Sequence, residues 1–153
     1  MFSFVLFLHS ITRWFVLAFL VFTLYRACIG LWKRKNFTAT DDFVRHSTAT
    51  LAHVQLIIGI TLYTKSSLVG YFWNHPKVDL KAEVLFYPVI HFLLMLTAII
   101  LVTIGSALAK RKSTDREKFQ TIVIWYSISL LIVLLAIPWP FSPLSQRPYL
   151  RQY

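Results

Sequence analysis

Cysteine, glycine and acidic residues are all scarce in this sequence. Its one cysteine, Cys28, allows no disulfide framework and no CxxC or CxxCH motif, which excludes a thiolate metal site and covalently attached c-type haem. It has only four glycines and six acidic residues. It also contains no phosphate-binding loop, no paired catalytic carboxylates and no nucleophile triad, so hydrolytic chemistry has no support.

Charge of either sign is also limited, whereas apolar residues are abundant. Charged residues make up 14% of the 153 residues and hydrophobic residues make up 57%. A soluble domain of this size has too much surface to carry so many apolar side chains. The net charge of +10 does not indicate nucleic-acid binding, because the basic residues cluster at the ends of apolar segments without an RNA-binding motif. The composition therefore indicates a one-domain membrane protein in contact with a lipid bilayer.

Four apolar segments are each near or above the ~20 residues that cross a bilayer core. They cover residues of about 3–31, 43–64, 82–109 and 117–137. The first is too long for a signal peptide, lacks a basic region before it and has no cleavage site after it, so we expect a retained helix. Short connections between the segments predict an all-α, up-down transmembrane four-helix bundle.

Capping residues support these boundaries. Thr40, Asp41 and Asp42 are expected to cap the second helix, and Thr114 with Glu117 forms a capping-box pattern before the fourth. The prolines of "IPWPF", residues 137–141, are expected to end the fourth helix.

Lysine and arginine placement predicts the orientation in the membrane. Ten basic residues lie in or beside the first and third connections, and five lie in the middle hairpin and the C-terminal tail. The two basic connections are therefore expected in the cytoplasm and both termini outside.

Three histidines, His9, His53 and His91, lie within the apolar segments. Ionisable groups in hydrocarbon are costly and are therefore functional candidates. At a rise of ~1.5 Å per residue, they lie roughly 9, 16 and 12 Å from the outer ends of their helices. Histidines that reach similar depth from different helices are a common way to build a cofactor site in a bundle.

Two neutral imidazoles on opposite faces of a porphyrin can ligate haem b. His53 and His91 are the favoured axial pair, because they lie on consecutive antiparallel helices at overlapping depth. His9 is an alternative ligand, most simply paired with His91, or a proton donor near a quinone. Arg13, one helical turn after His9, could pair with a haem propionate. Pro88 could kink the third helix and aim His91.

Other interpretations stay open. The histidines could only hydrogen-bond between helices in an accessory subunit of a larger membrane complex or in a homo-oligomer. Three histidines could also bind copper, iron or zinc. Arg13 could instead extend to the outer headgroups.

Four segments carry a resemblance to a known family: "LHSITRW", "AHVQLIIGITLY", "IHFLLML" and "IPWPF", in that order along nearly the whole chain. They resemble a family of small bacterial four-helix membrane proteins described as cytochrome b-like. The resemblance implies a haem b bundle in the cytoplasmic membrane of a bacterium, with His9, His53 and His91 at the motif histidines. The expected activity is electron transfer, with a quinone as a candidate partner.

Overall fold

The computed structural model describes residues 2–75 and 82–139, and within those ranges the chain is helical with no strand. Its four long helices are α1 (Phe2–Trp32), α2 (Ala39–Lys65), α5 (Phe92–Arg111) and α6 (Asp115–Ala136). Three short elements connect α2 to α5: α3 (Ser67–Asn74), α4 (Ala82–Leu85) and the π-helix η1 (Phe86–His91).

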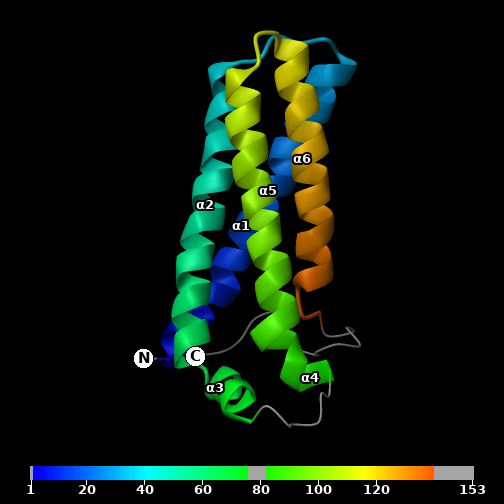
Figure 1. Ribbon diagram of the computed structural model, residues 1–153. Helices are drawn as coiled ribbons and strands as arrows, with labels where there is room; N and C mark the ends of the chain where they lie inside the picture. Colours follow the sequence, from blue (N-terminus) through cyan, green and yellow to red (C-terminus); the bar gives the residue numbers. More distant parts are fainter. Residues whose placement is uncertain (1, 76–81, 140–153) are drawn as a thin grey trace.

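The long helices run side by side, and the α1–α2 and α5–α6 turns lie at one end of the molecule (Figure 1). The N-terminus, α3, α4 and the end of α6 lie at the other end. Helix α1 contacts α2 and α6, and α5 contacts α6 and α2. Each long helix therefore has two long neighbours, and the basic turns share one end.

Three helical segments are long and apolar enough to cross a membrane: Phe2–Trp32, Phe86–Arg111 and Asp115–Ala136. The second predicted span is not one of them, although α2 is long enough. Its first half carries Asp41, Asp42, Arg45 and His46, and its centre carries His53, so it is more polar than its neighbours.

The cap of α2 differs from the prediction. Thr38, rather than Thr40 to Asp42, is the N-cap, and its side chain forms a capping box with Asp41. The helix therefore begins four residues before the predicted residue 43. The predicted capping box of Thr114 and Glu117 is confirmed, and α6 ends two residues before Pro138, as expected.

Small residues set the separation of the helices in the core. A Cβ on Gly105 of α5 would lie 2.4 Å from the Cβ of Trp125 in α6. A Cβ on Gly30 of α1 would lie 2.5 Å from the Phe119 ring, also in α6. At Gly105 the close atom is attached to the α6 backbone, so only glycine lets α5 and α6 approach so closely there, whereas at Gly30 it belongs to the far end of the Phe119 ring.

Pro88 lies inside η1, where the helix widens from α to π geometry over Phe86–His91. Proline has no N–H and cannot donate to the residue one turn earlier, so irregular turns gather at such positions. The Tyr63 hydroxyl of α2 donates to the Pro88 carbonyl at 3.1 Å. The predicted irregularity before His91 is therefore present, and His91 is the last residue of the π segment.

Candidate functional site

His9 of α1 and His91 of η1 lie next to each other. Their ring centroids are 6.4 Å apart and their planes are inclined at 67°. When two imidazoles ligate one metal, each nitrogen lies about 2 Å from it, so the ring centres are roughly 6 Å apart. The centroid spacing of this pair agrees with that distance, and rings in ordinary edge-to-face contact have the same spacing. The structure thus brings together the pair that the sequence offered as the alternative.

The His91 ring is held by the end of α6. Its Nδ1 lies 2.8 Å from the carbonyl oxygen of Ala136. A carbonyl can only accept, so Nδ1 carries the proton and Nε2 keeps its lone pair. Metal-ligating histidines usually donate their second N–H in this manner, which fixes the tautomer and the ring orientation.

His9 has a buried nitrogen whose hydrogen bonding is unsatisfied. Within residues 2–75 and 82–139, no hydrogen-bond partner reaches its Nδ1. The ring lies against Gly59 of α2, where an added Cβ would be 3.4 Å from Cε1. The Gln55 amide of α2 donates to the His9 carbonyl at 3.0 Å, which fixes α1 and α2 at this level. An unpaired buried nitrogen costs about 1–3 kcal/mol, so it requires an explanation, and a bound ligand is one.

Arg13 lies one turn beyond His9 on α1 and is half-buried. Its guanidinium lies 3.5 Å from the Ser10 hydroxyl and 5.3 Å from the centroid of the Trp14 ring. It is also close enough to His9 and His91 to interact electrostatically with both rings. The positive charge near the two imidazoles suits a ligand that carries a carboxylate.

His53 lies elsewhere. Its ring is exposed, and its Nε2 is 3.2 Å from the hydroxyl of Thr103 in α5. Thr103 follows His91 by 12 residues of mostly α-helix, which is ~18 Å along the axis. The structure therefore does not bring the favoured pair, His53 and His91, to one metal.

The three-histidine metal site also lacks support. In the part of the chain that the structure describes, no group of three or more His, Cys, Asp or Glu side chains could hold a metal ion. The prediction of a shared site relied mainly on the depth of each histidine along its helix. Depth does not specify which side of the helix each ring occupies.

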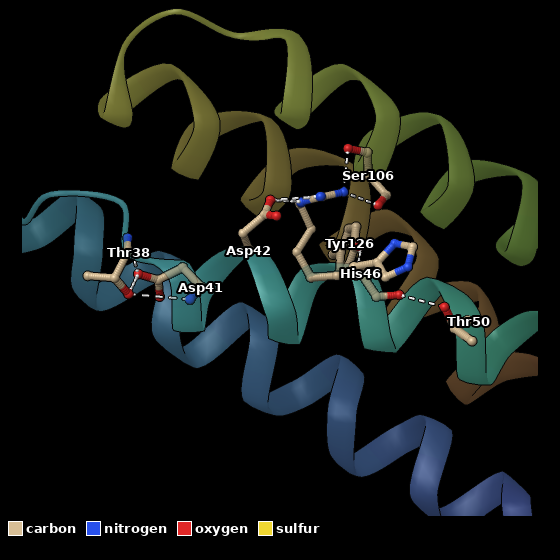
Figure 2. Close-up of polar contacts among 8 residues, drawn as sticks. Thr38, Asp41, Asp42, His46, Thr50, Ser106 and Tyr126 are labelled. Carbon is tan, nitrogen blue, oxygen red and sulfur yellow. Dashed lines mark hydrogen bonds and ion pairs between the residues drawn. The ribbon is translucent and has the colours of Figure 1, made fainter.

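Sequence reasoning counted Arg45 only as an orientation signal, but its side chain is 4% exposed. It donates to Asp42 at 2.7 Å and 3.0 Å, to the Ser106 carbonyl at 2.8 Å and to the Ser106 hydroxyl. The Tyr126 hydroxyl of α6 donates to the Arg45 carbonyl at 2.9 Å. This polar cluster connects α2 to both α5 and α6 near the turn end (Figure 2). Its sequence signal is Asp42 at three residues before Arg45, the spacing of a helical ion pair.

Asp41 forms a second ion pair at the same end. Its carboxylate accepts from Arg26 of α1 at 2.8 Å and from the backbone and hydroxyl of Thr38. Burial raises the pKa of Asp41, but the hydrogen bonds from Arg26 and Thr38 outweigh burial and hold its pKa below the usual value. The carboxylate is therefore ionised at neutral pH and ties the start of α2 to α1.

Comparison with known proteins gives no match: no family model fits the chain, and no curated protein or solved structure is detectably similar to it. The resemblance to cytochrome b-like proteins therefore stays a hypothesis. The function has to follow from the site itself.

Proposed function

We propose that this chain is a haem b protein of a bacterial cytoplasmic membrane, with His9 and His91 as the axial ligands. The observation that carries the proposal is the spacing of these two rings, 6.4 Å between centroids. The orphaned Nδ1 of His9 and the carbonyl-bound Nδ1 of His91 support it. Both features fit a pair of neutral imidazoles that receive a metal.

The proposed membrane arrangement is a four-helix bundle with α1, α2, α5 and α6 all spanning. Three of these are contained in segments apolar enough to cross alone, and α2 is flanked by α1 and α5. The basic turns would face the cytoplasm and the His9 end would face outward, because basic connections are retained inside.

The residues of the site have separate tasks. The Ala136 carbonyl keeps the His91 tautomer with Nε2 free, and Gly59 leaves room for the His9 ring. Arg13 would neutralise a haem propionate, since a charge-assisted pair offsets the penalty of a half-buried guanidinium. Bound haem would supply one-electron exchange between ferrous and ferric iron. The sequence and structure fit an electron carrier, whose donor and acceptor would be other redox partners.

Three alanine variants test the ligands: His9→Ala, His91→Ala and His53→Ala, each purified in detergent from cells supplied with haem. We expect reduced-minus-oxidised spectra to lose the low-spin α-band in the first two variants and to keep it in the third. His75→Ala is a matched control, because this exposed histidine stacks on Tyr71 outside the site.

Several results would refute the proposal. A parent protein without a Soret band binds no haem, and metal analysis then separates another metal site from a purely structural subunit. Loss of the band in His53→Ala with retention in His9→Ala would restore the pair favoured by sequence.

Arg13 is tested separately. Arg13→Ala should lower haem retention or shift the midpoint potential, whereas Arg13→Lys should keep part of the effect because it preserves the charge. An unchanged potential and unchanged retention in both variants would mean that Arg13 only extends to the headgroups.

A further inference from the structure

Helix α2 presents a polar stripe to the outside of the helix assembly. Asp42, His46, Thr50 and His53 recur at helical spacing on one face, and all four are exposed. Polar groups that face hydrocarbon are costly and are rarely left uncovered. The stripe therefore suits a ligand or protein that lies against α2.

A groove between α2 and α5 contains this stripe. Its volume is about 610 Å³, within the range typical of small-molecule sites. Ala49 and Ala107 line it from the two helices, and their short side chains leave the space open. His53 and Thr103 lie at the end of the groove away from the turns, and Lys110 lies at the end near the α5–α6 turn. The groove therefore has polar side chains along α2 and a small apolar surface at Ala49 and Ala107 between its two ends.

The hydrogen bonds of Thr103 determine which tautomer the neutral His53 ring adopts. The Thr103 hydroxyl donates its one proton to the Ile99 carbonyl at 2.7 Å. Its oxygen can therefore only accept from His53 Nε2, 3.2 Å away. His53 then carries its proton on Nε2 and has an acceptor at Nδ1. Such a nitrogen binds a ligand that has an O–H or N–H donor.

The charges in the groove select against an anionic ligand. Arg45, the buried cation behind the groove, is already bonded to Asp42 and to Ser106. Asp42 also lines the groove and adds a negative charge at the turn end. A phosphodiester would have Lys110 as its only uncommitted permanent cation among the lining residues, and a phosphodiester has no O–H to offer His53.

We propose that this groove binds the ring of a quinol, with a hydroxyl donating to His53 Nδ1 and the prenyl tail lying over Ala49 and Ala107. A quinol is neutral, carries O–H donors and reaches the groove laterally from the bilayer. The site deepens the proposed redox function but is ~18 Å along α5 from His91, so binding can be measured with or without haem.

Equilibrium dialysis of the full chain in detergent micelles, kept anaerobic, measures the binding of ubiquinol-1 and menaquinol-1. We expect saturable one-to-one binding of at least one of them. His53→Leu should weaken it about fivefold or more, since a neutral hydrogen bond is worth about 1 kcal/mol. The dimethyl ether of the same quinol, which has no O–H donor, should lose affinity by a similar factor.

A second variant fills the groove rather than removing a polar group. Ala107→Leu should weaken binding at least tenfold, whereas Ala18→Leu, on the exposed face of α1, should not. His75→Leu is the matched control for His53→Leu. The ether comparison uses unaltered protein, so it remains decisive if a variant fails to fold.

Binding that is not saturable, or that is unchanged in Ala107→Leu and equal for quinol and ether, would overturn the proposal. Displacement of quinol by phosphatidylethanolamine or phosphatidylglycerol, with tighter binding of the lipid, would assign the groove to a lipid headgroup instead. A parent without haem that still binds quinol would refute the haem site alone.

Discussion

Replacement of Gly105 by alanine should force α5 and α6 apart. The new methyl carbon would lie 2.4 Å from the Cβ of Trp125 and 2.9 Å from its Cγ. Carbon atoms prefer about 3.5–4.0 Å, so relief requires a shift of roughly 1 Å. The nearest atom is attached directly to the α6 backbone, and no rotation of the Trp125 side chain can move it away.

The expected change in unfolding free energy combines two opposing effects. Overpacking of a tight core costs about 1–3 kcal/mol. Alanine recovers about 1 kcal/mol over glycine inside a helix. Because the clash is with a fixed atom, we expect the upper part of the first range to apply. The net destabilisation is then about 2 kcal/mol.

Reversible unfolding of the purified protein in mixed micelles, titrated with denaturing detergent and followed by tryptophan fluorescence, measures this change. Gly70→Ala is the matched control, because in residues 2–75 and 82–139 no atom outside the local helix lies within 4 Å of the added methyl in α3. It should be neutral or gain up to about 1 kcal/mol. If Gly105→Ala proves as stable as the parent, the close approach of α5 and α6 at this level is wrong.

Three further predictions concern the turn end of the molecule. Asp42→Ala should destabilise the chain by about 2 kcal/mol, because it leaves the Arg45 guanidinium underpaired. The additional change Arg45→Met should recover much of that loss in a double-mutant cycle. A double variant less stable than either single variant would contradict this prediction. Since the pKa of Asp41 is held below its unfolded value, its stabilisation is complete above about pH 4 and is lost as the pH falls through the lowered pKa. The Asp41→Asn variant should therefore be less stable than the parent at neutral pH, and the difference in unfolding free energy should shrink in acid. A difference that does not change with pH would refute the ion-pair argument. In intact cells, a cysteine placed at Lys35 should resist an impermeant thiol reagent and one at Ser67 should react, whereas the opposite pattern would reverse the orientation.

Local sequence was sufficient for the four long helices, but it did not predict the short helix α3 (Ser67–Asn74) within the middle hairpin. Apolar segments near the bilayer-spanning length predicted four long helices, and the positions of Thr114, Glu117 and Pro138 predicted the bounds of the last one to within two residues. Capping and proline effects involve neighbours a few residues apart, so they can be read without the fold. The start of α2 was misplaced because Thr40 was taken as the cap, although Thr38 has an acidic residue, Asp41, at the capping-box position and Thr40 has Phe43 there.

The grouping of polar residues depended on tertiary structure. From sequence, His53 and His91 reach overlapping depths, yet the fold places His91 beside His9 and places His53 beside Thr103. Likewise, Arg45 resembles any basic residue near a turn, and only the packing of α2 against α5 and α6 buries it. The rotation and axial offset of each helix are set by contacts such as Gly105 with Trp125 and Gly30 with Phe119. Those contacts join distant parts of the chain, whereas helical spacing and hydropathy describe one segment at a time.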